Sequence, residues 1–402
     1  MLRCVRINVC MKLSRELIII FIIQITEVLG FSLILPLLPF YAESFGATPF
    51  VVSLIPSVFS LFQFFSAPIM GRLSDQYGRR LLLLISQTST FVSFIILGFS
   101  NSLFMIFMSR VVDGVLGSNF TIAQAYIADV TNKKDRSKAF GLSGMAFGIG
   151  FLIGPAIGGY LSKYGISVPA FVAAGISLLS IVATAVMLPE TVKKKKTSMN
   201  IKIVDIKTLS KYLSNEKTAK PIFELFTFNS THVIWTSNFA LFSGIKYGFT
   251  AESVGYVLAY VGLINIIMRG GLLPKLIDKL EERPLKIIAS LSIVFALLLL
   301  ALTKSPLLLF VAFTFFAFGG GIIRPLMTGA ISRSVGRKEQ GAILGVSNSL
   351  GSLAQIVGPM VGGLLLTKLI PESLMVVSAI IMAIGAFLII RNGQSDMHSK
   401  IY

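Results

Sequence analysis

The chain has 402 residues, of which 54% are hydrophobic and 13% charged. Soluble globular proteins carry roughly 25% charged residues, so this composition excludes an ordinary soluble domain and indicates a membrane protein. A net charge of +18 would suit nucleic acid. The basic residues, however, gather in loops between apolar segments, which indicates contact with anionic membrane lipid and no nucleic-acid partner.

The N-terminal tail precedes the first apolar segment and holds both cysteines, Cys4 and Cys10. Two cysteines on a reducing side predict no structural disulfide. No His or carboxylate cluster accompanies them, so we expect neither a metal nor another cofactor. Met1 and Met11 are both possible starts. The first apolar segment lacks a cleavage site of small residues, so we interpret it as retained.

Twelve apolar segments of about 20 residues follow the tail. A helix rises ~1.5 Å per residue, so each segment is long enough to cross a bilayer. We expect an all-α integral membrane protein with twelve transmembrane helices in two pseudo-symmetric six-helix bundles. The expected spans are residues 17–40, 50–70, 81–100, 103–128, 138–162, 167–188, 221–245, 250–271, 285–303, 306–332, 340–367 and 371–391.

An even number of spans places both termini on the same side of the membrane. Of the 36 Lys and Arg residues, 29 fall on that side, counting Lys138, Lys286 and Arg391 at the span ends there; three lie deeper within spans and four lie on the other side. This asymmetry follows the positive-inside rule, so we expect a multi-pass protein of the cell membrane with both termini in the cytoplasm.

The two halves repeat one another. Residues 71–80 return in degraded form at 274–283, and residues 154–159 return at 358–363, with offsets of 203 and 204 residues. We expect membrane domains over residues 1–190 and 219–402, joined by a basic cytoplasmic linker over 191–218. Solvation and lipid contact explain this linker better than a binding role. Two similar membrane halves suit a machine that opens alternately to either side of a bilayer.

Glu27 lies about ten residues into the first span, near mid-membrane, and Gln24 and Gly30 share its helical face. An ionisable side chain inside a bilayer costs roughly 3 kcal/mol and is a candidate for function by default. A low dielectric disfavours the charged form of a carboxylate, so Glu27 can bind and release a proton near physiological pH. The alternative is a permanently paired structural carboxylate.

Asp75 lies between Gly71 and Arg80 in the loop after the second span and is spaced to pair with Arg79 or to accept from a helix N-terminus. Asp129, at the inner end of the fourth span, is placed to join either arginine. If the arginines only anchored the topology, the spacing of the glycines and Asp75 would stay unexplained. We therefore expect conformational machinery here.

Arg110 and Asp113 are three residues apart and share a face of the fourth span. That face continues through Gly117, Thr121 and Gln124 as a polar stripe, which should line a water-filled cavity or pair within the bundle. Arg110 stays charged, so its expected role is to lower the proton affinity of Asp113 or of the first-span acid, or to make that acid release its proton. The alternative is a static pair that only stabilises the helix.

Gly150, Gly154 and Gly158 recur every four residues in the fifth span. They form a face of small residues that lets helices approach closely; Gly159 is a further packing residue, and Pro155 permits a bend. Packing by itself explains this face.

The seventh span carries polar and aromatic residues on two adjacent faces, which suits a site for varied, partly apolar molecules. His232 is equally well explained as a hydrogen-bonded histidine, and Trp235 as a packing residue. Arg324 follows three glycines and precedes Pro325, which predicts a local helix irregularity where a cation faces the cavity; an anionic substrate is allowed but not required. The expected cavity residues are Gln24, Thr121, Gln124, Asn229, His232, Trp235, Asn238, Asn265 and Arg324.

Six spans, a basic linker and six further spans resemble the major facilitator superfamily over essentially the whole chain. The stretch Gly71-x-Leu-x-Asp75-x-x-Gly78-Arg79-Arg80 matches that superfamily's loop 2–3 signature, and residues 110–117 and 150–159 resemble its fourth- and fifth-span motifs. Residues 27–39 look like the first-span signature of the twelve-span drug:proton antiporters, which include the tetracycline-type exporters. The chain departs from the family at Glu27, where many members carry Asp, and at Asp113, where an uncharged residue is common.

The resemblance implies that Glu27 is the coupling acid, that the loop 2–3 cluster is a latch closing the cytoplasmic side, and that the fifth-span glycines seal the halves against leak. We expect a monomeric secondary transporter that exports small amphipathic molecules in exchange for protons. An importer or uniporter of a sugar or organic anion is the second interpretation. A membrane enzyme or sensor is the third, disfavoured because the sequence has no P-loop, zinc motif, convincing Ser/His/Asp set or signalling domain.

Overall fold

The computed structural model describes residues 14–132, 135–192, 206–336 and 339–398. The two cysteines, both possible starts and Lys193 to Lys196 of the linker lie outside the described residues. Within these ranges the chain is helical and has no strand. The prediction of an all-α membrane protein is confirmed.

The first half contains α1 (Arg15–Ile34), α2 (Leu38–Glu43), α3 (Pro49–Tyr77), α4 (Arg79–Gly98), α5 (Leu103–Leu116), α6 (Asn119–Val130), α7 (Arg136–Leu161), the 3₁₀ turn Ser162–Tyr164 and α8 (Val168–Met187). After the linker helix α9 (Ile206–Ser214), the second half contains α10 (Glu216–Tyr247), α11 (Ala251–Ile267), the π turn Met268–Leu272, α12 (Leu273–Lys279), α13 (Glu282–Leu302), α14 (Pro306–Arg333), α15 (Gln340–Lys368) and α16 (Glu372–His398).

Ten helices of the described chain are long and apolar enough to cross a membrane, with α5 and α6 counted together as Leu103–Val130. The other two expected spans are α11, which is shorter and passes into the π turn, and α10, which has 32 residues but a lower hydrophobicity. Side-chain caps start several of these helices; Ser14 accepts from the N–H of Leu17, and Thr48 from that of Val51.

Two predicted spans are interrupted in the structure. The helix predicted over 17–40 ends at Ile34, and a turn leads into α2, because Pro36 and Pro39 cannot supply the backbone donors of a continuing helix. The helix predicted over 103–128 breaks at Gly117 and Ser118 into α5 and α6. The fourth span is present as Leu103–Val130, but the prediction that it is one continuous helix was wrong, and the break forms part of the site described below.

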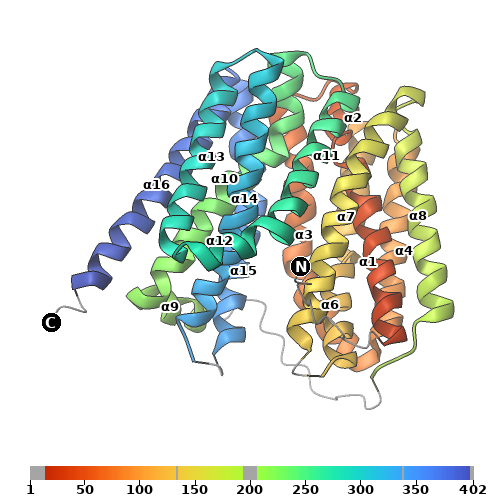
Figure 1. Cartoon of the computed structure of the whole chain (residues 1–402). Helices are drawn as coiled ribbons and strands as arrows, with labels where there is room; N and C mark the ends of the chain where they lie inside the picture. The colour runs from red at the N-terminus through yellow and green to blue at the C-terminus, as the bar shows by residue number, and fades with distance from the viewer. Residues whose placement is uncertain (1–13, 133–134, 193–205, 337–338, 399–402) are drawn as a thin grey trace, which may run out of the picture.

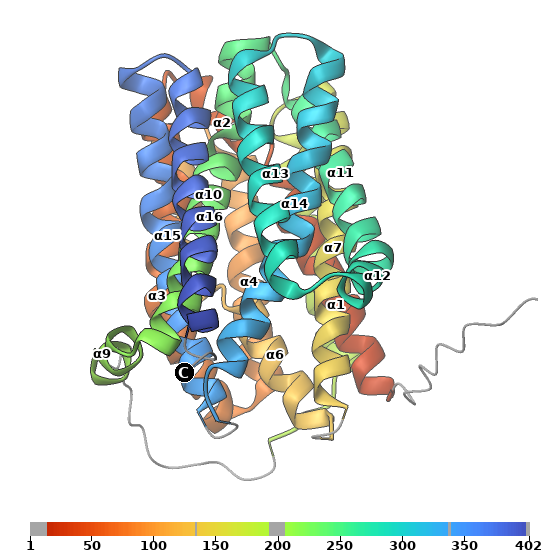
Figure 2. The same ribbon diagram turned by 60° about the vertical axis from the view of Figure 1, so that its left-hand side comes forward.

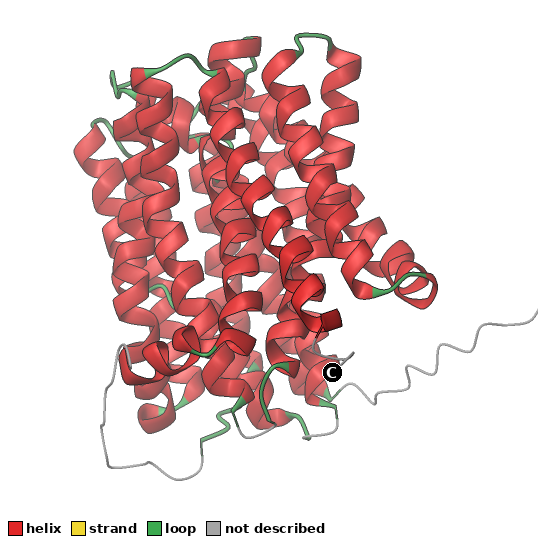
Figure 3. Cartoon of the chain, turned by 90° about the vertical axis from the view of Figure 1, so that its left-hand side faces the viewer, coloured by secondary structure: helices red, strands yellow, loops and turns green. Residues whose placement is uncertain are grey.

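The two halves stand side by side (Figure 1) and meet through α7 with α11 and α3 with α15. The backbone N–H of Phe50 donates to Thr367 Oγ1 at 3.0 Å, and Lys163 Nζ lies 2.8 Å from Glu252 Oε1. These contacts lie at the helix ends opposite α9 (Figure 2). Helices run through the whole height of the molecule, and loops cap its two ends (Figure 3).

Corresponding positions in the two halves make the same contact. Ser89 Oγ on α4 donates to the carbonyl of Val112 on α5 at 2.7 Å, and Ser292 Oγ on α13 donates to the carbonyl of Phe315 on α14 at 2.7 Å. Both residues of the second pair follow those of the first by 203 positions (292 − 89 and 315 − 112). The sequence repeat is thus also a structural repeat, and residues of the two halves can be compared at this offset.

Candidate functional site

A chain of hydrogen bonds joins the two acidic side chains predicted inside the first half. Asn119 Nδ2 donates to Glu27 Oε2 at 2.6 Å and to Thr90 Oγ1 at 3.1 Å, and Thr90 Oγ1 donates to Asp113 Oδ1 at 2.8 Å. Along this chain of bonds, Glu27 comes from α1, Asn119 from α6, Thr90 from α4 and Asp113 from α5. We call them the acid bridge. Asn119 and Thr90 were not predicted from the sequence.

Arg110 completes this polar group on the side of Asp113. Its Nη1 lies 3.8 Å from Asp113 Oδ2, its Nη2 donates to Ser93 Oγ at 2.8 Å and its Nε to Ser109 Oγ at 3.2 Å. The guanidinium also lies 6.0 Å from the centre of the Phe94 ring. Arg110 and Asp113 are 3% and 4% exposed, so both charges are buried, and each has hydrogen-bonding partners besides the other.

The helix break places Asn119 in this group. In an unbroken helix Asn119 would be six residues beyond Asp113, on a different face. Beyond the break, the stripe expected to run from Arg110 to Gln124 loses its register, so Thr121 lies beside Gly71 of α3 instead. Side chains of α3 and α4 satisfy the freed backbone groups: Ser66 Oγ donates to Val115 O (2.5 Å), Gln63 Nε2 donates to Gly117 O (3.2 Å), and the N–H of Ser118 donates to Ser86 Oγ (2.7 Å).

Neutral groups complete the surroundings of Glu27. Gln87 and Ser180 approach its carboxyl from α4 and α8, and Gln87 Nε2 donates to Ser180 Oγ at 3.0 Å. Oε1 of Glu27, Oε1 of Gln87 and Oδ1 of Asn119 are buried acceptors without a donor among the described residues. A proton on the Glu27 carboxyl would add a donor to this group of acceptors.

The second half has an aromatic stack at the corresponding depth. The His232 ring lies between Phe228 and Phe316, with centroids 5.7 and 6.0 Å away and planes within 19°. The Trp235 ring lies 4.2 Å from that of Phe316. Phe316 follows Asp113 by 203 positions, so the stack occupies in the second half the place that an acid occupies in the first.

Several predicted cavity residues make helix–helix contacts in this conformation. Trp235 is 1% exposed, and Asn238 is fully buried and donates to the carbonyl of Pro359 at 3.2 Å. Gln24 accepts from Ser143 Oγ at 2.7 Å and holds α1 to α7. The remaining predicted positions are half-buried or exposed, namely Thr121, Gln124, Asn229, His232 and Asn265.

Arg324 is exposed although it lies within the membrane-spanning helix α14, and its guanidinium forms no hydrogen bond or ion pair with another described side chain. Gly320, one turn before it, faces open space. The irregularity predicted here from the three glycines was wrong, because α14 runs unbroken from Pro306 to Arg333 with Pro325 inside it.

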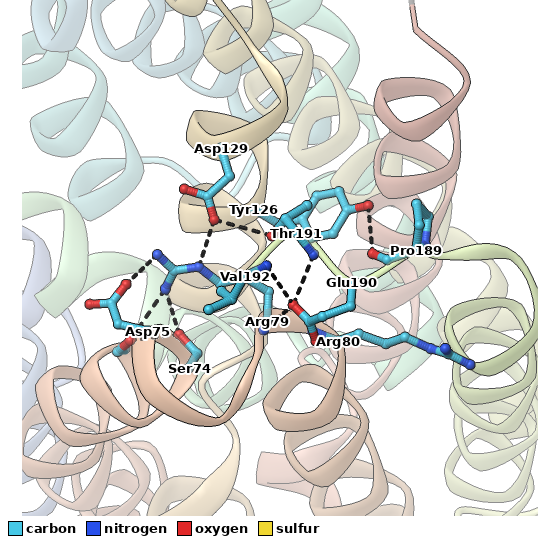
Figure 4. A network of polar contacts seen from close by, with 11 residues as sticks. Ser74, Asp75, Arg79, Arg80, Tyr126, Asp129, Pro189, Glu190, Thr191 and Val192 are labelled. Atoms are coloured by element: carbon cyan, nitrogen blue, oxygen red, sulfur yellow. Dashed lines mark hydrogen bonds and ion pairs between the residues drawn. The ribbon is translucent and has the colours of Figure 1, made fainter. Parts of the chain in front are cut away.

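The loop 2–3 motif forms a charged cluster at the linker end of the first half, shown in Figure 4. Residues up to Tyr77 are helical, and the chain turns only at Gly78, whose φ is +111°. Arg79 forms an ion pair with Asp75 and a second with Asp129 at 2.9 Å, and its Nη1 donates to Ser74 Oγ at 2.6 Å. The cluster therefore joins α3, α4 and α6.

Glu190, which was not predicted, closes the cluster. Its carboxylate accepts the backbone N–H groups of Arg79 at 2.9 Å and Arg80 at 3.1 Å, so it caps the N-terminus of α4. Arg80 also donates to the carbonyl of Ala185. None of the hydrogen bonds and ion pairs described for this cluster reaches the second half.

The fifth-span glycines pack in two directions. A side chain at Gly150, Gly154 or Gly158 would meet α1, so this face lets α7 approach α1 closely. Gly159 and Pro155 face α11 of the other half, where Gly255 allows backbone contact. The small residues thus pack within the first half and also across the interface between halves.

Glu224 lies near the cytoplasmic end of α10, but its side chain does not extend toward the membrane surface. It is 4% exposed, its Oε2 lies 3.1 Å from Lys286 Nζ, and its Oε1 accepts from Asn392 Nδ2 at 2.9 Å. The three residues join α10, α13 and α16. In the described part of the chain, no group of three or more His, Cys, Asp or Glu side chains is arranged to hold a metal ion.

Two similar helical halves that carry polar groups between apolar spans define the class as a multi-pass membrane transporter. The chain belongs to the Major Facilitator Superfamily, whose sequence model matches residues 20–307 and 286–400. It is therefore a transporter of small molecules.

Curated relatives of similar length match most of the chain. It is 27% identical over 355 residues to the class B tetracycline resistance protein of Escherichia coli, covering 87% of this chain and 88% of that one. It is 28% identical over 367 residues to multidrug resistance protein 2 of Bacillus subtilis, covering 86% and 88%. These relatives agree with the resemblance to the drug:proton antiporter branch.

Solved structures share the fold at lower identity. The human organic anion transporter MFSD10 superposes with a TM-score of 0.71 at 22% identity, over 93% of this chain and 99% of that one. A point mutant of the nucleoside transporter NupG superposes with a TM-score of 0.79 at 11% identity, over 94% and 99%.

Proposed function

We propose that the protein is a proton-coupled antiporter that exports small amphipathic, drug-like molecules across the cell membrane by alternating access. The observation that carries this proposal is the acid bridge. Two carboxyls and one arginine lie inside apolar helices. Ionisable groups cost free energy there, so they are rare and are candidates for function. The relatives, named for tetracycline and multidrug resistance, support export and a drug-like cargo.

In this proposal the two halves have different tasks. Glu27 and Asp113 exchange protons with water, and Arg110 stabilises the ionised form of Asp113. The aromatic stack around His232 offers flat apolar contact area, and the neutral side chains of Asn229 and Asn265 offer hydrogen bonds, so together they suit cargo that is partly apolar. Gln24, Thr121, Gln124, Trp235, Asn238 and Arg324 complete the proposed cavity as the helices move.

The remaining parts of the proposal concern topology and movement. The excess of Lys and Arg on the linker side places both termini in the cytoplasm, and the chain acts as a monomer. The cluster of Asp75, Arg79 and Asp129 acts as a latch on the cytoplasmic side: it holds charged groups at that end of the first half, where charge-assisted contacts to the second half can form as that side closes and break as it opens. Glycines of α7 provide the surface on which the halves close.

Reconstitution of the purified chain in liposomes with an imposed pH gradient tests the function. We expect a drug-like fluorescent substrate to move against its gradient while protons move the other way. Glu27→Gln should abolish gradient-driven transport while expression and folding persist, and Glu43→Gln, outside the acid bridge, should leave it intact. Accumulation that stays the same after the pH gradient is collapsed contradicts proton coupling.

A second candidate cargo is an organic anion. The exposed guanidinium of Arg324 favours it, because an arginine that no described side chain engages can bind a carboxylate with two parallel hydrogen bonds. Competition of anionic, neutral and cationic amphiphiles in the same liposomes distinguishes the two cargo classes.

A further inference from the structure

We propose that Asn119 and Thr90 are positioning residues that join the Glu27 and Asp113 carboxyls into one protonation unit, so that the proton affinity of each acid depends on the state of the other. This inference rests on the proposed function. It goes beyond it by assigning the coupling to two neutral residues and to the break in the fourth span.

The two donor residues of the bridge differ in freedom: the amide of Asn119 has fixed hydrogen-bond directions, whereas the hydroxyl of Thr90 can turn between two acceptors. Both amide hydrogens of Asn119 are used, one toward Glu27 and one toward Thr90. The hydroxyl hydrogen of Thr90 has two acceptors within reach, Asp113 Oδ1 at 2.8 Å and the carbonyl of Ser86 at 3.3 Å. Thr90 therefore has two hydrogen-bonding states.

The charge of Asp113 selects between these two states. When Asp113 is ionised, Thr90 donates to it. When Asp113 takes up a proton, its new hydroxyl donates to Thr90, whose hydrogen turns to Ser86. Hydrogen bonds in series polarise one another, so the bond from Asn119 to Thr90, and with it the amide that faces Glu27, responds to the change. The bridge itself transfers no proton, because an amide side chain does not titrate; each carboxyl exchanges its proton with water.

The two carboxyls and Arg110 are the charged groups that act on this unit. The neighbouring side chains that the other helices present are neutral. Gln87 from α4 and Ser180 from α8 lie at the Glu27 carboxyl, Gln63 from α3 donates to the carbonyl of Gly117 at the break, and Ser143 from α7 donates to Gln24, three residues before Glu27. With so few charges nearby, the hydrogen bonds of the bridge are a large part of what each acid experiences.

The second half shows that the fold does not need these polar residues. At an offset of 203, Thr90, Asn119 and Asp113 correspond to Ile293, Ile322 and Phe316. All three are apolar and at most 2% exposed. Because the repeat packs well without polar groups at these positions, packing does not account for the bridge in the first half.

The decisive measurement follows carboxyl protonation in the purified full-length chain by infrared difference spectroscopy. Glu27→Gln and Asp113→Asn assign the bands. In the otherwise unchanged protein we expect each substitution to move the titration midpoint of the other acid by about one pH unit, the size of one hydrogen bond to a charged group. In the background of Thr90→Val or Asn119→Leu, this cross-shift should fall by at least half.

Two matched variants separate the bridge from ordinary packing. Thr90→Ser keeps the hydroxyl and should keep the full cross-shift. Ser89→Ala removes a buried hydrogen bond between the same two helices, 2.7 Å long, but does not touch the bridge, and it too should keep the full cross-shift. An undiminished cross-shift in both Thr90→Val and Asn119→Leu overturns the inference, as does a wild type without any cross-shift.

Transport assays test the bridge and the proposed function separately. We expect Thr90→Val to move the pH dependence of transport by about one unit, with an unchanged KM for substrate. The double variant Thr90→Val/Asn119→Leu should shift it no further than either single variant, because both break the same connection. If the wild type ignores a pH gradient, the proposed function fails, and the infrared cross-shift still decides the bridge.

Discussion

Arg110 and Arg324 lie within spans of opposite halves and have different surroundings. Arg110 is buried beside Asp113, and two serine hydroxyls accept from its guanidinium. Arg324 is exposed, and no described side chain pairs with it. Its charge is thus available to a ligand, whereas that of Arg110 is used inside the protein.

We therefore predict that Arg324 selects among cargo molecules. Arg324→Gln should lower the transport of an anionic amphiphile by about tenfold or more relative to a neutral one, since a charge-assisted hydrogen bond contributes roughly 1.5–3 kcal/mol. Competition assays in liposomes measure this ratio, and Arg324→Lys should retain part of it. A ratio unchanged in Arg324→Gln would show that the guanidinium does not face the cargo.

Charged residues of the site could be found in the sequence, and neutral ones could not. Glu27, Arg110 and Asp113 stand out because ionisable residues are rare in apolar spans. Asn119 and Thr90 do not stand out, because neutral polar residues are frequent in such helices and usually bond their own backbone. The helix break at Gly117 is a second reason why Asn119 was missed, since an unbroken helix would place Asn119 on a different face from Asp113.

At the level of elements, the break between α5 and α6 and the continuity of α14 have a common explanation. A broken helix inside a membrane needs partners for its freed backbone groups. Ser86 and Gln63 supply them in the first half. Their counterparts at an offset of 203 are Ala289 and Ile266, which offer no hydrogen bond, so α14 stays intact despite its glycines. The glycines by themselves therefore predicted a helix irregularity in α14, whereas the break lies between α5 and α6.

The close contact between α7 and α1 leads to a prediction about Gly158. A methyl group there would collide with the carbonyl of Leu33, so Gly158→Ala should destabilise the protein by about 1–3 kcal/mol, as overpacking does. Gly144→Ala on the same helix is the matched control, since that position faces open space. Thermal unfolding in detergent measures both. Equal midpoints for the two variants would mean that the helices can move apart without cost.

The architecture of twelve segments and the repeat were predictable, because length, apolarity and an offset of about 203 residues are properties of the chain itself. The contacts between halves were not. They depend on which glycine faces of α7 and α11 and which ends of α3 and α15 come together, and the pattern of a single helix does not contain that information.

At the scale of the whole molecule, the halves are joined at the end opposite α9, which predicts where the molecule must open. In a background with Cys4 and Cys10 replaced by Ser, the pair Phe50→Cys/Thr367→Cys lies across the 3.0 Å hydrogen bond between α3 and α15. Oxidation of this pair should stop transport, and a reductant should restore it, because alternating access requires this end to separate.

A crosslink within one half serves as the control for this experiment. Ser89→Cys/Val112→Cys joins α4 to α5 inside the first half, and its oxidation should leave transport largely intact, because that half is expected to move as a body. Full transport by the oxidised Phe50–Thr367 pair would contradict the requirement that this end opens.

The correspondence of Asp113 with Phe316 has a consequence for variants of the protein. One repeat carries an acid at this position and the other an aromatic ring, so in the proposed function the use of the proton gradient and the recognition of cargo reside in separate repeats. Under that proposal, variants with an altered cargo specificity should carry substitutions around Phe316 and Phe228. Their use of the proton gradient should remain unaltered, because the acids of the first repeat stay as they are.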